Sequence, residues 1–260
     1  MSYKTILVTE EDGVETIMLN RPERRNAMTP EMQSELIAAM EEAGASDCRV
    51  VVFAGAGEAF CAGRDLSALQ GMNNKTAAEH TADAERVAKL FRTLYELTKP
   101  TIAMVQGAAV AGGTGLATMC DFTLAVPGAK FGYTEVRIGF VPAVVSAFLV
   151  LQIGDKQARD LLLTARLFTS EEALRLGLVN EVVEAGRLEA RTLELAGVLK
   201  ANSPEALAAT KRLLRAQNRV WLDAAIAEAL AANAEARRTH DFREGVAAFL
   251  EKRKPVWGRA

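Results

Sequence analysis

The chain has 260 residues, which is enough for one large domain or two modest ones with a sizeable core. Half of the residues are hydrophobic and a quarter are charged, an ordinary globular composition that excludes a disordered, collagen-like or coiled-coil chain. The 31 Lys and Arg residues nearly balance the 33 Asp and Glu residues, so no overall positive field is available to hold nucleic acid or an anionic bilayer.

Two strands and a capped helix are predicted at the start of the chain. Residues 3–9 and 14–20 have the composition of strands, and the Asp-Gly pair at 12–13 between them is a hairpin turn signal. Thr29 is suited to cap a helix whose first residue is Pro30. We therefore expect a β-hairpin followed by a helix.

Three continuous apolar runs follow, at 50–53, 101–105 and 122–126. Runs of this kind are typical of strands that are buried on both faces. A polar stretch from about 66 to 97, between the first two runs, is predicted to be helical. Strands that alternate with helices indicate an α/β fold with mostly parallel pairing.

From about residue 143 onward the chain is predicted to be mainly helical. The sequence TSEE at 169–172 is a capping box, and Gly177 suits the end of the helix that this box starts. Residues 179–183, with three valines, are predicted to form one more short strand.

The C-terminal region is an Ala-rich helical stretch that Ser203 and Pro204 open. We expect it to be broken near Trp221 and again near Asp241. The helices at 204–238 are either an appendage on the core or a subunit interface. We favour the interface, because helices with few bulky core residues need a surface to pack against.

The three cysteines are widely spaced, so they form neither a disulfide framework nor a CxxC metal pair. With only two histidines in the chain, a His-based zinc site is poorly supplied, and we expect no bound metal. The first residues show no signal-peptide pattern, and no apolar run approaches the ~18 residues of a membrane span. We expect a cytoplasmic protein that binds neither a membrane nor nucleic acid.

Two glycine-containing turns follow two of the predicted strands, at 55–66 and at 107–115. Their small residues leave room for a ligand to reach the main chain, and a short helix there would carry unpaired N–H groups near Gly112. Neither turn matches a phosphate-binding fingerprint, and each alone is explained as well by tight turns and close packing. Together they predict two main-chain donors at one point, which is the arrangement of an oxyanion hole.

Glu135 is the candidate acid or base, because it lies in the mostly apolar segment 131–142. Partial burial of a carboxyl group raises its pKa toward the range that is useful for proton transfer. An ion pair with Arg137 is the simpler alternative for this glutamate.

An ordered set of motifs resembles the signatures of the enoyl-CoA hydratase/isomerase (crotonase) superfamily over nearly the whole chain. Any one of them is weak, but their order and spacing agree. They are NRP at 20–22 with NA at 26–27, AFCAGRDL at 59–66, the segments 107–121 and 131–142, AR at 165–166 with the Ala173 to Val179 stretch, and FLEKR at 249–253.

The resemblance implies a spiral of β-β-α units over residues 1–200 and a helical region over 201–260 that assembles trimers or hexamers. It also implies that the chain binds acyl-CoA thioesters and stabilises an enolate with the N–H groups of Ala62 and Gly112, beside the acid/base Glu135. No separate cofactor is implied, because coenzyme A is part of the substrate.

Contacts with the substrate and its coenzyme A are implied along two turns and the terminal helix. The resemblance places them at Arg24, Arg25, Ala62, Gly63, Arg64, Asp65, Leu66, Gly113, Phe140, Phe249 and Lys252. A basic cluster at 252–254 fits local capture of phosphates, although a solvated helix end explains these residues equally well.

The sequence departs from typical hydratases of the family at one catalytic position. Those enzymes carry two glutamates, whereas here the first position is Gly115 and only Glu135 remains. Tyr133 and Asp65 are conceivable substitutes for the missing acid, but we rate a structural role above a catalytic one for both. The segment AVVS at 143–146 replaces a glycine-rich run, so we expect an acyl pocket of a different shape.

One carboxyl group limits the possible reactions. We expect an enoyl-CoA hydratase that adds water across a 2-enoyl-CoA thioester, with Glu135 as the acid/base. The alternatives are an isomerase that moves a 3-enoyl double bond with the same glutamate, a hydratase of the methylglutaconyl-CoA type, and a non-catalytic acyl-CoA-binding protein. The last is favoured if Glu135 is held in a salt bridge away from the pocket.

Overall fold

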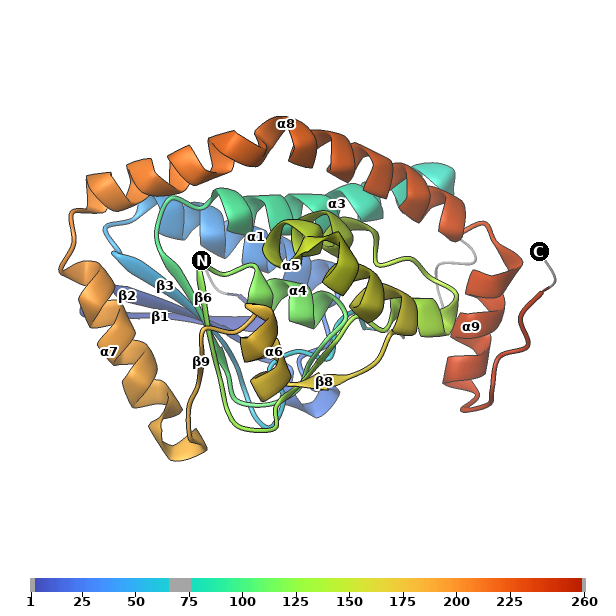
Figure 1. The fold of residues 1–260 in the computed structure, drawn as a ribbon, viewed down its shortest axis with the longest axis horizontal. Helices are drawn as coiled ribbons and strands as arrows, with labels where there is room; N and C mark the ends of the chain where they lie inside the picture. The colour runs from blue at the N-terminus through green and yellow to red at the C-terminus, as the bar shows by residue number, and fades with distance from the viewer. Residues whose placement is uncertain (1–2, 66–75, 259–260) are drawn as a thin grey trace.

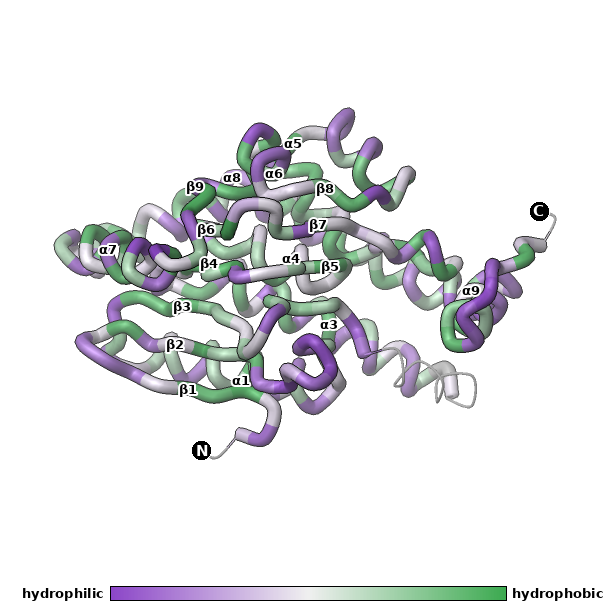
Figure 2. Tube along the Cα trace, turned by 90° about the horizontal axis from the view of Figure 1, so that it is seen from below, coloured by the Kyte–Doolittle hydropathy of each residue, from purple (hydrophilic) through white to green (hydrophobic). Residues whose placement is uncertain are grey.

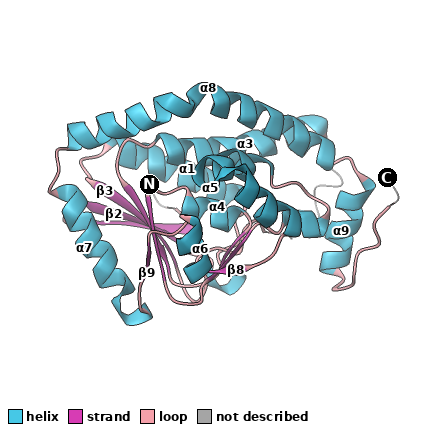
Figure 3. Cartoon of the chain, viewed as in Figure 1, coloured by secondary structure: helices cyan, strands magenta, loops and turns pink. Residues whose placement is uncertain are grey.

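The computed structural model describes residues 3–65 and 76–258, which form one large sheet, one small sheet and a surrounding set of helices (Figure 1, Figure 3). In the large sheet the first pair of strands is antiparallel and all other pairs are parallel. Its strand order is β1 (Ile6–Glu11), β2 (Val14–Leu19), β3 (Val50–Gly55), β4 (Thr101–Val105), β6 (Phe122–Ala125) and β9 (Glu181–Val182).

The hairpin that the Asp-Gly pair predicts is confirmed. Asp12 and Gly13 both have positive φ, 49° and 71°, as the tight turn between two twisted strands requires. Strand β1 reaches Glu11, beyond the predicted end, because its last residues pair with the start of β2. The turn forms a hydrophilic end of the sheet (Figure 2).

The small sheet lies beyond the carboxyl ends of β4 and β6. Its order is β5 (Ala109–Val110), β7 (Lys130–Gly132) and β8 (Phe168–Thr169). Each unit therefore contributes one strand to the large sheet, one to the small sheet and then a helix, as in β4-β5-α4 and β6-β7-α5. This is the predicted spiral of β-β-α units.

The helices cover both faces of the large sheet and one end of the molecule (Figure 1). The longer ones are α1 (Pro30–Ala45), α3 (Ala77–Glu96), α5 (Ala143–Thr164), α7 (Leu188–Lys200), α8 (Pro204–Ala236) and α9 (His240–Leu250). Shorter ones are η1 (Pro22–Arg24), α4 (Gly112–Thr118), η3 (Glu135–Ile138), α6 (Ser170–Leu176) and η4 (Ala185–Arg187). Thr29, Thr169 and Ser203 cap α1, α6 and α8 as predicted. Among the described helices, none combines the length and apolar character of a membrane span.

Strand β3 shows why the apolar runs are continuous. Val50 and Val52 pack in the cluster that includes Leu188 and Leu199 of α7, whereas Val51 and Phe53 belong to the main core that α1 and α3 complete. Each face of the strand is therefore buried under helices, which confirms the expectation of double burial.

Helix α8 is continuous from residue 204 to 236, so the predicted break near Trp221 is wrong. No glycine or proline follows Pro204 within the helix, and a run of apolar residues alone does not end a helix. Its buried residues Leu222, Ile226 and Ala229 recur at helical spacing and face α3 and α5. The second predicted break is confirmed, because Thr239 caps α9.

Candidate active site

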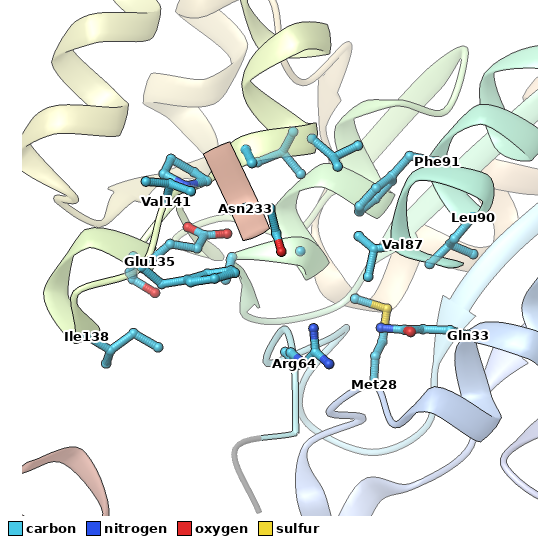
Figure 4. A pocket seen from close by; sticks show the side chains of 18 of the residues that line it. Met28, Gln33, Arg64, Val87, Leu90, Phe91, Glu135, Ile138, Val141 and Asn233 are labelled. Atoms are coloured by element: carbon cyan, nitrogen blue, oxygen red, sulfur yellow. The ribbon is translucent and has the colours of Figure 1, made fainter. Parts of the chain in front are cut away.

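A pocket opens between the start of η3, the turn that ends β3, and helices α3, α4 and α5 (Figure 4). Its wall is mostly apolar, and side chains of α8 and α9 complete one side. The apolar residues that line it include Met28, Val87, Leu90, Phe91, Val144 and Val145. The segment at 143–146 thus contributes to the pocket lining, and the expected difference in pocket shape from typical hydratases stays a prediction.

Glu135 is the only acidic side chain among the described residues that line this pocket. Its Oε2 atom is fully buried and has no hydrogen-bond partner among the described residues. The alternative ion pair with Arg137 does not form, since Arg137 is exposed and takes part in no salt bridge within the described part of the chain. Burial raises the pKa of Glu135 to about 7, so its ionised and neutral forms are both populated near neutral pH.

The two glycine-containing turns lie side by side. A bridge between Cys61 and Ala109 joins them: Cys61 N–H donates to the Ala108 carbonyl at 3.1 Å, and Val110 N–H donates to the Cys61 carbonyl at 2.9 Å. A Cβ atom on Gly113 would lie 2.3 Å from the Cys61 carbonyl oxygen. Close packing of the turns therefore requires glycine at this position.

Gly63 and Gly113 were expected to contact substrate, but neither lines the pocket. Gly63 has a φ of 86°, and a Cβ atom on it would lie 2.7 Å from the Val110 carbonyl oxygen. Both glycines lie in the contact between the turns, behind the wall that faces the pocket. At these two positions the explanation by tight turns and close packing holds.

The donors on the two turns are not the pair that the sequence predicts. The Ala62 N–H donates to the Arg25 carbonyl at 2.9 Å, so it is not free to bind a substrate oxygen, and the assignment of Ala62 as a donor is wrong. Among the described residues, Arg64 and Gly112 line the pocket and carry main-chain N–H groups without an acceptor. Their N–H groups can bind an oxygen that becomes negative in a reaction.

The turn before Gly112 is strained. Ala111 has a φ of 51° and a ψ of −124°, a conformation that residues with a Cβ atom rarely adopt. Such strain costs on the order of 1–3 kcal/mol and persists only where the surroundings impose it. Here it sets the direction of the peptide group that carries the Gly112 N–H.

Gly115 faces an apolar wall where typical relatives carry a second glutamate. A Cβ atom at this position would lie 2.6 Å from Cγ1 of Val145 and 3.3 Å from the ring of Phe91. The space of the missing side chain is therefore filled by two apolar groups. Sequence reasoning identified the glycine but not Phe91, whose place in the pocket depends on how α3 packs against α4.

Neither proposed substitute for the second acid faces the pocket. Asp65 forms a salt bridge with Arg21 at 2.9 Å. The buried Tyr133 hydroxyl pairs with the Thr118 hydroxyl at 3.3 Å, and burial raises the pKa of this tyrosine. Both residues have the structural roles that the sequence favoured.

The remaining predicted contacts divide into two groups. Phe140 and Phe249 line the pocket. Arg24, Arg25 and Lys252 are exposed and lie outside its lining, so their contact with coenzyme A stays a prediction. Leu66 lies outside the described residues.

Within the described residues, neither the Cys61 thiol nor a metal site is suited to catalysis. The Cys61 thiol is buried and donates to the Asn26 carbonyl at 3.2 Å, and burial raises its pKa to about 12, so it stays protonated. No group of three His, Cys, Asp or Glu side chains that could hold a metal ion occurs in the described part of the chain.

Comparison with known proteins identifies the class of enzyme to which this fold belongs. The sequence model of the enoyl-CoA hydratase/isomerase family matches residues 9–260. The chain belongs to this family.

Two relatives and one solved structure match this chain over nearly its whole length. A Thermus thermophilus protein provisionally named as an enoyl-CoA hydratase is 43% identical over 247 residues, which are 95% of this chain and 98% of its own. The crotonyl-CoA hydratase of Syntrophomonas wolfei is 32% identical, with 98% of each chain covered. A crystal structure of an enoyl-CoA hydratase/isomerase from Xanthobacter autotrophicus superimposes with a TM-score of 0.89 at 31% identity, covering 96% of this chain and 97% of that one.

Proposed function

We propose that the protein is an enoyl-CoA hydratase that uses Glu135 as its single acid/base and the N–H groups of Arg64 and Gly112 as its oxyanion hole. The observation that carries this proposal is the carboxyl group of Glu135. Its Oε2 atom is buried and has no partner among the described residues, and the mostly apolar lining of the pocket also holds the main-chain N–H groups of Arg64 and Gly112. Since no salt bridge with another described residue holds Glu135 away from the pocket, a non-catalytic binding role is disfavoured.

One carboxyl group can complete hydration. The Glu135 carboxylate takes a proton from water while the water oxygen bonds to C3 of the 2-enoyl thioester. The electrons of the C2–C3 double bond then move onto the thioester oxygen, which the two N–H groups bind as an enolate. Glu135 finally returns its proton to C2, and the enolate collapses to the 3-hydroxyacyl thioester. The proton that leaves water is the one that C2 receives, so the sum is one water added.

The electrostatic stabilisation comes from the main chain. A well-placed donor is worth about 2.7–4 kcal/mol of transition-state stabilisation in a comparable oxyanion hole. A pKa of about 7 suits the proton transfer, because Glu135 must both accept and donate within one turnover.

Isomerisation is the second candidate, and the apolar wall at Gly115 is the observation that favours it. A shift of the double bond from C3–C4 to C2–C3 needs only one base, which removes a proton from C2 and returns it at C4. Val145 and Phe91 occupy the place from which a second acid would help to orient water.

A panel of 2-enoyl-CoA and 3-enoyl-CoA thioesters separates the two reactions. Mass spectrometry of the products distinguishes them, because only hydration adds the mass of water. We expect hydration of crotonyl-CoA to be the faster reaction. Isomerisation of 3-hexenoyl-CoA with no hydration of any 2-enoyl thioester would overturn the proposal.

A further inference from the structure

A buried carboxylate lies behind the part of the pocket wall that Arg64 forms. Asp83 of α3 has no exposed side-chain surface and accepts hydrogen bonds from three guanidinium groups. The distances are 2.5 Å from Arg64 Nη2, 2.8 Å from Arg237 Nη2 and 3.2 Å from Arg86 Nη2. Although burial alone would raise it, the arginines, Arg64 above all, lower the pKa of Asp83 to about 2.

The second buried partner, Arg237, comes from the end of α8. Only 1% of its side chain is exposed, and its Nε donates to Asn233 Oδ1 at 2.8 Å. Burying charges in this way is costly, and an apolar cluster of similar volume is often as stable. A purely stabilising role therefore does not account for the network.

The network reaches both sides of the candidate active site. Arg64 carries one of the two proposed oxyanion donors on its own main chain. On the other side, the Arg237 guanidinium lies 5.7 Å from the ring centre of Phe140. The Phe140 N–H donates to the Glu135 carbonyl at 3.1 Å, so this ring is tied to the turn that carries the acid/base.

The main chain at Arg64 is held on both sides. Its neighbours are bonded to Met28: the Met28 N–H donates to the Gly63 carbonyl at 2.7 Å, and the Asp65 N–H donates to the Met28 carbonyl at 3.0 Å. The N–H of Arg64 itself must stay free to serve as a donor. These bonds hold the peptide groups on either side of Arg64, and the ion pair with Asp83 adds an anchor for its side chain.

We propose that Asp83 is a positioning residue, which holds the Arg64 side chain so that the main-chain N–H of Arg64 points at the thioester oxygen, with Arg237 fixing Asp83 from α8. This inference rests on the proposed function, since it assigns a purpose to the Arg64 donor. Through Arg237, it also assigns the C-terminal region a role in positioning the active site of its own chain. A shift of about 1 Å in a reacting group can cost on the order of 10²-fold in rate.

The variant Arg64→Met tests the anchor, because it keeps the main-chain N–H and removes the ion pair with Asp83. Asp83 still has two guanidinium partners in this variant, which favours folding. We expect kcat with crotonyl-CoA to fall by about 10- to 100-fold while KM changes by less than about threefold. Arg64→Lys keeps a charge for Asp83 and should recover part of the loss.

A ligand that forms an enolate gives a readout that a merely structural role would not change. Acetoacetyl-CoA bound in an oxyanion hole is converted in part to its enolate, which absorbs in the near ultraviolet. We expect this absorbance per bound ligand to fall in Arg64→Met and in Asp83→Asn. The double variant should be no worse than Asp83→Asn alone, because the aspartate change already removes the ion pair with Arg64.

Arg86→Met is the matched control, since Arg86 bonds to the same carboxylate but does not line the pocket. It should keep the kcat and the enolate absorbance of the unaltered protein. Unchanged values in Arg64→Met, or a loss confined to KM, would overturn the positioning role. If the unaltered protein neither enolises acetoacetyl-CoA nor converts any enoyl-CoA, the proposed function fails instead.

Discussion

Replacing Glu135 by glutamine removes the only acidic group among the described residues that line the pocket and keeps the size of the side chain almost unchanged. An amide neither accepts the proton of water nor returns it to C2. General acid–base groups typically contribute 10²–10⁴-fold to a rate, and here one group serves both steps. We expect turnover of crotonyl-CoA to fall by at least about 10³-fold. The unaltered enzyme should lose kcat/KM as the pH falls through about 7, because hydration starts from the ionised form.

The same variant changes stability in a pH-dependent way. Burial raises the pKa of Glu135 from 4.5 to about 7 in the folded chain, a shift that corresponds to roughly 3 kcal/mol. Because the folded pKa is the higher one, the stability linked to this proton is fully present below about 4.5 and is lost as the pH rises through about 7. Glutamine has no such proton, so the variant escapes this loss.

Urea unfolding of both proteins between pH 5 and pH 8.5 measures the effect. We expect the free energy of unfolding of the glutamine variant to rise relative to that of the unaltered protein by roughly 3 kcal/mol over this range. Glu58→Gln is the control, since Glu58 is exposed and should give a constant difference. If the difference in unfolding free energy between the two proteins does not change with pH, the carboxyl group of Glu135 is not buried as described. If the glutamine variant turns over crotonyl-CoA at an unchanged rate, Glu135 is not the acid/base.

Three further predictions follow from the site and the C-terminal helix. Gly115→Glu should be destabilised by about 1–3 kcal/mol in thermal or urea unfolding, because its Cβ would meet Val145. The second change Val145→Gly should relieve this clash, and an equally stable single variant would contradict the packing. Cys61→Ser should keep its activity, since the serine hydroxyl can make the same bond to the Asn26 carbonyl; a folded but inactive protein would reveal a missed nucleophile. Sedimentation at micromolar concentration should show an oligomer, because α8 exposes Leu213, Val220 and Trp221; a monomer would refute the interface.

Local signals in the sequence predicted most of the fold. Caps, a hairpin turn and doubly buried strands each depend on a few adjacent residues, and the structure confirms them at Thr29, at Asp12-Gly13 and along β3. The predicted break near Trp221 is wrong, because the burial of one face of α8 against α3 and α5 maintains the helix.

The sequence predicted which turns form the candidate site, but not which main-chain N–H group on them is free to act as a donor. Ala62 and Arg64 lie two residues apart on the same turn, and the donor role was assigned to Ala62, whereas the free N–H group is that of Arg64. What separates them is a bond from Ala62 to the carbonyl of Arg25, 37 positions earlier in the chain. No spacing within the motif reveals this bond, because it depends on how η1 packs against the turn after β3.

The network around Asp83 was missed for the same reason. Its partners Arg64 and Arg237 lie 19 and 154 positions away, and α3 shows at this point only an ordinary helical aspartate. The position of Arg64 could have suggested such a network. This arginine lies on the turn at which the resemblance places a main-chain donor, and a long cationic side chain there needs an acidic partner.

The apolar wall at Gly115 also bears on the choice between the two candidate reactions. A second carboxyl group would help to hold the attacking water, and without it Glu135 must both orient the water and take its proton. Isomerisation carries no such demand, since Glu135 then acts directly on carbon. The ratio of hydration to isomerisation should therefore be lower than in a relative with two glutamates. Measuring both rates with the paired change Gly115→Glu and Val145→Gly tests this: a gain in hydration at the expense of isomerisation is expected, and an unchanged ratio would show that water is oriented by some other group.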